Sequence, residues 1–406
     1  MRSLHSYLIG TGTWFASFGM QSVLFAWLVA MVLRERPENV GIAQMVLLLP
    51  GTLFILIGGS YADRYGGRRV ATVAQTVAAL APLFLLGALL TDALSFGVML
   101  AYAVLLGTAQ AFVTPGRDGL LNQVAAGRVQ RTVMLASVAQ FGMQIVGSLL
   151  ASVADFVGPE PLLVLQILLL LIGALAFTRV QIAAPKAPEP TVTAVTPPSI
   201  LALVLEGART VFAEPALRII VFQNVAMALF FMGSFIVTIP LMVREVFAGS
   251  ASDLAWVNAA NGAGLVATII VLLQIGGIRR QGRALLLSQI VGGVTLAGAA
   301  FMPTYWGFVA VLFVWGVCGG VAMTMSRSIM QQQAPAAMHG RVMSFYGFSF
   351  MGAGPVGALL SGFLVGALGA QQALVTSACG MLLVVLLVAS RSGLWRIEST
   401  EHAAAT

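Results

Sequence analysis

The chain has 406 residues, of which 59% are hydrophobic and only 9% are charged. Soluble domains carry roughly 25% charged residues, so this composition excludes a water-soluble globule and leaves lipid as the solvent for the apolar surface. The net charge of +7 does not indicate a nucleic-acid-binding protein, because the basic residues stand in ones to threes between apolar runs.

The lysine and cysteine residues exclude a P-loop ATPase and a cysteine-based metal or disulfide framework. The lone lysine, Lys186, lies in a proline-rich stretch and not in a glycine-rich phosphate loop, so the chain is not a P-loop ATPase. Cys318 and Cys379 both lie in apolar runs, without the spacing of a metal site or a disulfide framework. We therefore expect neither a metal ion nor a cofactor.

Continuous apolar runs recur along the chain. A helix needs about 20 mostly apolar residues to cross the hydrocarbon core, and these runs lack the short alternation of a membrane β-barrel. We predict an all-α integral membrane protein with about twelve transmembrane helices in two six-helix bundles. The predicted spans are residues 7–33, 40–60, 70–91, 96–123, 132–154, 161–179, 218–243, 253–275, 284–302, 305–330, 341–366 and 371–390.

A polar interruption divides these runs into two halves. Proline recurs in residues 181–198 too often for a helix, and residues 200–218 have the pattern of an amphipathic helix on the membrane surface. The predicted organisation is an N-terminal bundle, a cytoplasmic linker, a C-terminal bundle and a cytoplasmic tail, at residues 1–180, 181–217, 218–391 and 392–406.

The basic residues predict the orientation. With the N-terminus in the cytoplasm, all of the 21 Lys and Arg residues except Arg34, Arg36 and Arg244 fall in inner loops or at the inner ends of spans. The positive-inside rule then places both termini in the cytoplasm. We expect a multi-pass protein of a bacterial cytoplasmic (inner) membrane.

The two halves also repeat in sequence. When the sequence is shifted against itself without a gap, Arg117 superposes on Arg327 and Gly147 on Gly357. The same shift gives several other identities in the fourth and fifth spans of each half. Parallel repeats of six spans are typical of transporters that rock two halves about a site near the midplane.

The loop between the second and third predicted spans reads GGSYADRYGGRR. It resembles the signature loop of the major facilitator superfamily, G-x-x-x-D-R-x-G-R-R, and its pattern is matched by Gly59, Asp63, Arg64 and Gly66. We expect Gly59 to let two helices approach and Gly66 to permit a tight turn. Asp63 can face a helix N-terminus or an arginine, as a latch between the two halves.

The signature loop departs from the pattern at Gly67, where an arginine usually follows the second glycine. The partner of the acid is then Arg68 or Arg69. The equivalent loop of the second half has Arg279 where the acid would be, so only the first half keeps an acidic latch.

Longer stretches, at residues 111–124, 134–151 and 339–364, resemble the branch of this superfamily that holds the enterobactin and macrolide exporters. The resemblance implies the major facilitator fold, a small-molecule substrate, outward transport and protons as the coupling ion. It does not identify the substrate. We expect a monomer in the lipid bilayer, without a nucleic-acid partner.

Asp118 is the carboxylate predicted to lie inside the membrane boundary, next to Arg117 at the inner end of the fourth span. A charge there needs a partner. Two readings stay open: a relay in which Asp118 binds Arg68 or Arg69 and exchanges partners during closure, and a static ion pair at the membrane interface. The deep acid and the mid-span arginine of many drug/proton antiporters are absent, so the residues themselves give proton coupling little support.

Neutral amides are the other polar groups predicted within the spans. An amide in a span tends to face the bundle, either to join helices or to line a cavity. The candidates for a substrate cavity, with Trp14 and Trp256 as aromatic neighbours, are Gln21, Gln110, Gln140, Gln144, Gln223, Asn224, Asn258 and Asn261.

The sequence thus predicts a permease that moves a small neutral or amphipathic organic solute by alternating access, most simply outward. An importer of the same fold is one alternative. A transport-dead membrane sensor or assembly protein is another. We do not expect an enzyme, because no metalloprotease pair or Ser/His/Asp set lies in the spans.

Overall fold

The computed structural model describes residues 2–124, 129–181, 208–275, 278–335 and 338–398. In this part of the chain, 12 helices are long and apolar enough to cross a membrane, which confirms the all-α fold and the predicted number of spans. The first span begins at Ser3, earlier than predicted. The proline-rich segment from residue 182 on, and the first part of the predicted amphipathic helix, residues 200–207, lie outside the described residues. Residues 208–213 of that helix are described and are helical.

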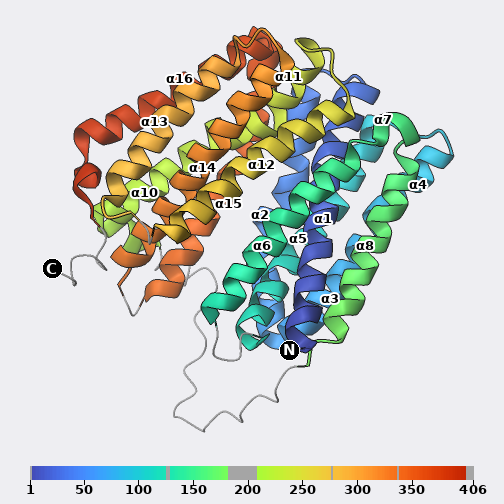
Figure 1. The fold of residues 1–406 in the computed structure, drawn as a ribbon. Helices are drawn as coiled ribbons and strands as arrows, with labels where there is room; N and C mark the ends of the chain where they lie inside the picture. The colour runs from blue at the N-terminus through green and yellow to red at the C-terminus, as the bar shows by residue number, and fades with distance from the viewer. Residues whose placement is uncertain (1, 125–128, 182–207, 276–277, 336–337, 399–406) are drawn as a thin grey trace.

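The first six spans form the N-terminal bundle, coloured blue to green in Figure 1. Span 3 is divided in two near Ala79, because Pro82 has no amide hydrogen for the carbonyl of Ala78. The helices of this bundle are α1 (Arg2–Trp27), the π-helical η1 (Leu28–Val32), α2 (Pro37–Tyr65), α3 (Gly67–Ala78), α4 (Leu80–Leu90), α5 (Phe96–Val124), α6 (Val129–Ala151), α7 (Ala154–Val157) and α8 (Glu160–Thr178).

The last six spans form the C-terminal bundle, yellow-green to red in Figure 1. Its first span is interrupted by two π-helical segments. The helices are α10 (Pro215–Ala226), η2 (Met227–Met232), η3 (Ser234–Thr238), α11 (Ile239–Glu245), α12 (Ala251–Gln274), α13 (Gln281–Ala299), α14 (Tyr305–Gln333), α15 (His339–Leu368), α16 (Ala370–Arg391) and η5 (Gly393–Arg396).

Two glycines that the sequence repeat superposes occupy equivalent places in the two bundles. A side chain on Gly147 of α6 would overlap the backbone of α1 at Ala16. A side chain on Gly357 of α15 would likewise overlap the backbone of span 7 at Ala228. In each bundle, therefore, the fifth span packs against the first with backbone in contact, and only glycine permits this spacing.

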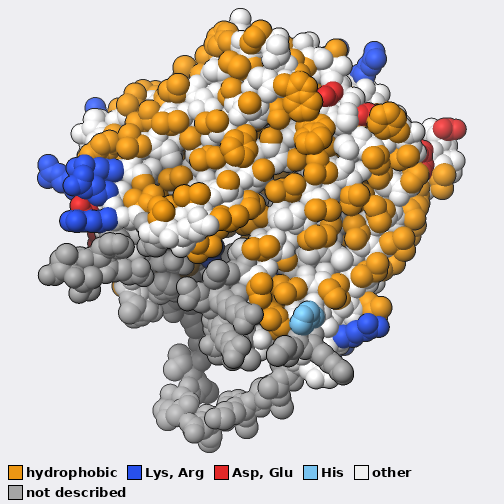
Figure 2. Space-filling model, in the orientation of Figure 1, with side chains coloured by type: hydrophobic (Ala, Val, Ile, Leu, Met, Phe, Trp, Pro, Cys, Tyr) orange, Lys and Arg blue, Asp and Glu red, His pale blue; other side chains and the backbone are white. Residues whose placement is uncertain are grey.

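The two bundles lie side by side at the upper right of Figure 1 and diverge toward the left and lower edges, where α16 ends and α1 begins. We call these left and lower ends of the two bundles the terminal end, and the opposite, upper-right end the far end. Figure 2 shows hydrophobic side chains across the middle of this face, while most of the visible Lys and Arg side chains lie toward the terminal end. The apolar band and its charged border are those of a protein embedded in a bilayer.

Candidate functional site

A depression of about 580 Å³ lies at the terminal end of the N-terminal bundle, between the α2–α3 turn and α5. It brings the two acids singled out from the sequence to one place. Its lining consists of Gly59, Ala62, Asp63, Gly66, Gly67, Pro115, Asp118, Gly119 and Gln123. We call it the terminal-end depression.

The turn that carries the signature loop depends on Gly66. This residue has φ of 83°, in the left-handed region that favours glycine, and it separates α2 from α3 without an intervening loop. The next residue, Gly67, lies against the backbone of α5, since a Cβ there would be 2.5 Å from the carbonyl oxygen of Gly116. The tight turn predicted at Gly66 is therefore present.

The helix approach predicted at Gly59 is made by its neighbour instead. A side chain on Gly58 would overlap the carbonyl of Ala111 in α5, whereas no atom of the described residues lies within 4 Å of the Cβ position of Gly59. Adjacent helical residues point about 100° apart, so Gly58 faces α5 and Gly59 faces the open depression. The prediction for Gly59 is wrong in this conformation.

Asp118 pairs with its neighbour Arg117, whose Nη2 lies 3.0 Å from Oδ1 of the acid. The guanidinium also lies over the ring of Phe15 in α1, 4.8 Å from its centroid. The Asp118 side chain is 61% exposed, whereas Arg117 is buried. Within the described residues Nη1 of Arg117 has no hydrogen-bond partner, so the arginine keeps one donor free.

The arginines of the signature loop have other contacts. Arg68 donates from Nη1 to the carbonyl of Val180, at 3.1 Å, and Arg64 lies over the ring of Tyr65. For Asp63 and Arg69 no hydrogen bond or ion pair is found among the residues that the structure describes. A latch by Asp63, and a pairing of Asp118 with Arg68 or Arg69, thus stay predictions for a different conformation.

Two of the eight candidate amides meet in the N-terminal bundle. Gln21 of α1 and Gln110 of α5 line a small pocket together with Trp14, Ser17, Phe18, Leu106 and Gln166. The pocket has about 10 Å³ of free space, which is close to what one water needs. It is uncharged and partly aromatic.

Three of the amides join helices of the C-terminal bundle. Gln223 donates to Gln289 of α13 at 3.0 Å, and Asn224 donates to Oγ of Ser349 in α15 at 2.9 Å. Asn261 reaches a carbonyl of α14, at Leu312, with a longer contact of 3.4 Å.

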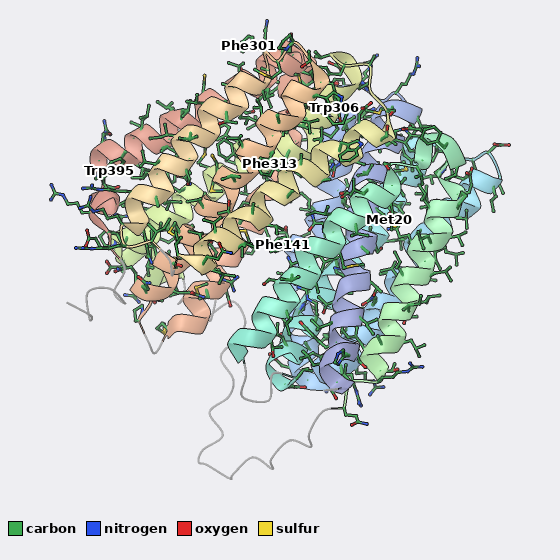
Figure 3. The ribbon with its side chains drawn as sticks, in the orientation of Figure 1. Met20, Phe141, Phe301, Trp306, Phe313 and Trp395 are labelled. Carbon is green, nitrogen blue, oxygen red and sulfur yellow. The ribbon has the colours of Figure 1, made fainter. Side chains whose placement is uncertain are left out.

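The remaining amides are less constrained. Asn258 donates to Leu254 in its own helix. Gln140 and Gln144 are half-buried on α6, the helix on which Figure 3 shows Phe141 on the side toward the other bundle. Trp256, expected near a cavity, is instead 46% exposed and stacks edge-on with Trp306, as in an interfacial aromatic belt.

Sequence reasoning overlooked several buried amides, two of them in the outer spans of the N-terminal bundle. Gln166 of α8 donates to the carbonyl of Ser17 at 3.4 Å. Gln75 of α3 is fully buried, and neither of its amide atoms has a partner within the described residues. The same signal, an amide within an apolar run, was present at both positions.

Arg244, at the end of span 7, holds the two bundles together at the far end. Its Nη1 donates to the carbonyl oxygens of Ala30, at 2.9 Å, and Glu35, at 2.8 Å, both at the end of span 1. The last carbonyls of a helix have no partner within the helix, so they accept hydrogen bonds from such a cation. Arg244 also pairs with Glu245.

Asp155 of α7 makes the second contact between the bundles at the far end. Its carboxylate accepts hydrogen bonds from the backbone amides of Ala251, at 3.1 Å, and Ser252, at 2.8 Å. These amides begin α12, where unpaired N–H groups and the helix dipole favour an anion. Sequence reasoning missed both Arg244 and Asp155, because their partners are backbone groups far away in the chain.

Close backbone packing completes the contact between the bundles. A Cβ on Gly41 of α2 would lie 2.8 Å from the carbonyl oxygen of Ala358 in α15, and one on Gly362 would lie 2.9 Å from Cα of Gly41. Nearer the middle of these helices, Oγ1 of Thr52 donates to the carbonyl of Met351 at 2.9 Å. The identified contacts thus run from the far end to the middle of the protein.

Comparison with solved structures gives the fold. The chain is similar to the nucleoside transporter NupG, with a TM-score of 0.71 and 15% identity, covering 96% of this chain and 99% of that one. It is similar to an auto-inhibited peptide transporter of the POT family, with a TM-score of 0.73, 16% identity, and 96% and 97% covered. A bacterial homologue of the lysosomal transporter Spinster, solved inward-facing and unoccupied, gives a TM-score of 0.68 at 13% identity, with 97% and 95% covered.

Sequence comparison gives the family. A multidrug efflux pump, Tap of Mycolicibacterium fortuitum, is 25% identical over 381 residues, which are 91% of this chain and 90% of the pump. The sequence profile of the Major Facilitator Superfamily matches residues 7–354 and, again, 222–405. The chain therefore belongs to the major facilitator superfamily and is a membrane transporter, not an enzyme.

Proposed function

We propose that this transporter exports a small neutral or amphipathic organic solute across a bacterial cytoplasmic membrane by alternating access. The single observation that carries the proposal is the asymmetry of contacts between the bundles. Hydrogen bonds that Arg244 donates and that Asp155 accepts, together with the Gly41–Gly362 packing, join the bundles at the far end. Toward the terminal end the bundles lie apart (Figure 1).

This asymmetry is what we expect of one of the two main states of an alternating-access cycle, in which the bundles are closed at one end and open at the other. Most of the basic side chains visible in Figure 2 lie toward the terminal end, which the positive-inside rule assigns to the cytoplasm. With this orientation, the proposed state of the structure is inward-facing. In the opposite state the far-end contacts break, and the terminal ends of the bundles meet near Asp63.

The chemistry of the interior supports an uncharged solute. The pocket between Gln21 and Gln110 holds about one water in this conformation, so a solute requires it to widen during the cycle. Its described lining residues are uncharged, and Trp14 and Phe18 supply aromatic surface. Amides with aromatic neighbours can orient an uncharged polar molecule by hydrogen bonds and stacking. A small inorganic ion would find no compensating charge there.

The direction of transport rests on the relative. Tap is named as a multidrug efflux pump and aligns with nearly the whole chain. The same fold supports an importer, so the direction needs an experiment that separates the two.

The test compares cells that lack the protein with cells that express it. Export predicts that loss of the protein increases sensitivity to some members of a panel of toxic neutral and amphipathic compounds, and slows the loss of preloaded Nile red. Import predicts the opposite change in sensitivity, or loss of growth on one nutrient. Equal behaviour of the two strains in every assay would contradict transport of this class of solute.

A further inference from the structure

A second hollow lies on the outer face of the N-terminal bundle, between α2, α3 and α5. This groove encloses about 560 Å³ and is walled mainly by apolar side chains. Among them Val73 of α3 is 54% exposed and Val104 of α5 is 46% exposed. Helix α3 packs against α2, α4, α5 and α8, all helices of the N-terminal bundle, so the groove beside its exposed side chains opens to the bilayer and not to the space between the bundles.

The groove has the length of one leaflet. Its mouth is at the terminal end, where Tyr61, Tyr65 and Arg69 line it, and it reaches Val77 near the end of α3. The eight helical steps from Arg69 to Val77 span about 12 Å at 1.5 Å per residue, close to half of the roughly 30 Å hydrocarbon core. One acyl chain lying along α3 would therefore keep its headgroup at Arg69.

The mouth of the groove favours a negative headgroup. Arg69 is the charged residue among the described residues that line it, and no acidic side chain does. The guanidinium of Arg64 lies nearby in sequence, over the ring of Tyr65 at 5.4 Å from the centroid. The two acids of this region, Asp63 and Asp118, line the terminal-end depression instead.

We propose that this groove is a binding site for an anionic phospholipid of the leaflet at the terminal end. The phosphate is held by Arg69, whose guanidinium is exposed and has no partner among the described residues. The tyrosine hydroxyls at the mouth supply neutral hydrogen bonds at the level of the headgroup. One acyl chain fills the apolar part between Val73 and Val104.

The test measures lipid binding to the purified, delipidated full-length protein by native mass spectrometry. The probes are dioleoyl phosphatidylglycerol and dioleoyl phosphatidylethanolamine, which share their acyl chains and differ in net charge. We expect wild-type protein to bind the first phosphatidylglycerol more tightly. Arg69→Gln is expected to weaken that binding about fivefold, the factor that corresponds to about 1 kcal/mol per basic residue near a membrane. Its effect on phosphatidylethanolamine should be small.

Three further variants make the result specific. Arg69→Lys keeps the charge and should keep the preference for phosphatidylglycerol. Arg279→Gln removes an exposed arginine of the equivalent loop, where it pairs with Glu398, and should change nothing. Thr108→Trp fills the groove beside α5 and should weaken the binding of both lipids.

Several results would overturn the site. One is equal loss of phosphatidylglycerol binding in Arg69→Gln and Arg279→Gln, which would show diffuse attraction by surface charge. Unchanged binding of both lipids in Thr108→Trp would place the acyl chain elsewhere. Equal affinity of wild-type protein for the two lipids would remove the role of Arg69.

Discussion

Arg244 and Ala30 lie 214 positions apart in the chain, and Nη1 of the arginine donates a 2.9 Å hydrogen bond to the carbonyl of the alanine. This contact ties the last turn of span 7 to the last turn of span 1, and so joins the two bundles where both spans end. Any cycle that opens the far end has to break it.

Arg244→Gln is therefore expected to destabilise the state that the structure describes. A hydrogen bond to a charged group is worth about 1.5–3 kcal/mol, so its loss should shift the balance toward the far-end-open state by about tenfold or more. The measurement is the distance between spin labels at Gln123→Cys and Gln331→Cys, two exposed positions at the terminal ends of α5 and α14, with Cys318 and Cys379 replaced by serine. A shorter distance distribution is expected.

The matched control is Arg36→Gln, which removes an exposed far-end arginine for which no contact between the bundles is found within the described residues. It should leave the distance distribution as in the parent protein. A parent-like distribution in Arg244→Gln would show that the hydrogen bond does not hold the far end closed.

Asp63→Asn is expected to give normally inserted protein with strongly reduced transport. Asp63 lines the terminal-end depression, and for it no ion pair or hydrogen bond is found within the described residues. Its proposed role is therefore to stabilise the opposite state, in which the terminal ends meet. The measurement is Nile red efflux at equal membrane expression. The control is Asp92→Asn, an exposed acid of the α4–α5 turn. Wild-type efflux by Asp63→Asn would rule out the latch.

Asp118→Asn is expected to keep any dependence of transport on a pH gradient. A carboxyl group that carries protons at neutral pH needs burial away from cations, whereas Asp118 is largely exposed and pairs with Arg117. Its proposed role is therefore that of a structural or gating pair. The measurement is transport by membrane vesicles under an imposed pH gradient, for wild type and variant. If wild-type transport follows the gradient and the variant shows only gradient-independent flux, Asp118 carries the proton.

The orientation is tested by reporter fusions. Fusions after Lys186 and after Thr406 should report the cytoplasm, and fusions near Glu38 and Glu160 should report the outside. The reason is the gathering of basic residues in the loops of the terminal end. An external signal at Lys186 would refute the arrangement of six spans, an inner linker and six more.

The positions of the spans could be predicted because hydropathy is a local property of the sequence. A run of about 20 consecutive apolar residues is by itself enough to place one membrane-spanning helix. The turn at Gly66 was also predictable, because a glycine between two predicted helices indicates a backbone conformation that other residues rarely adopt. By contrast, the contact that each amide makes depends on how its helix is rotated. Gln223 and Gln289 lie 66 positions apart, and nothing near either residue indicates their pairing.

The contacts between the bundles at the far end could not be predicted from the sequence, for a related reason. Asp155 and Arg244 bind backbone groups of the other bundle, and a backbone carbonyl or amide leaves no residue-type pattern to recognise. Their positions follow from the relative placement of the two bundles. That placement changes during a transport cycle, so one sequence has to support more than one set of contacts.

The central claim, that transport needs the bundles to separate, is tested most directly by a cross-link between them. A Cβ on Gly262 of α12 would lie 3.1 Å from Cγ1 of Ile145 on α6, so a cysteine pair at these positions joins the bundles. A pair at Gly12 and Met143 is the matched control, because a Cβ on Gly12 would lie 3.2 Å from Cγ of Met143 within one bundle.

The measurement is Nile red efflux by both cysteine pairs, in protein without the native cysteines, before oxidation, after oxidation and after reduction. The account predicts that oxidation stops efflux by the Ile145→Cys/Gly262→Cys protein, that reduction restores it, and that the Gly12→Cys/Met143→Cys protein transports throughout. Undiminished efflux by fully cross-linked Ile145→Cys/Gly262→Cys protein would contradict alternating access by separation of the two bundles.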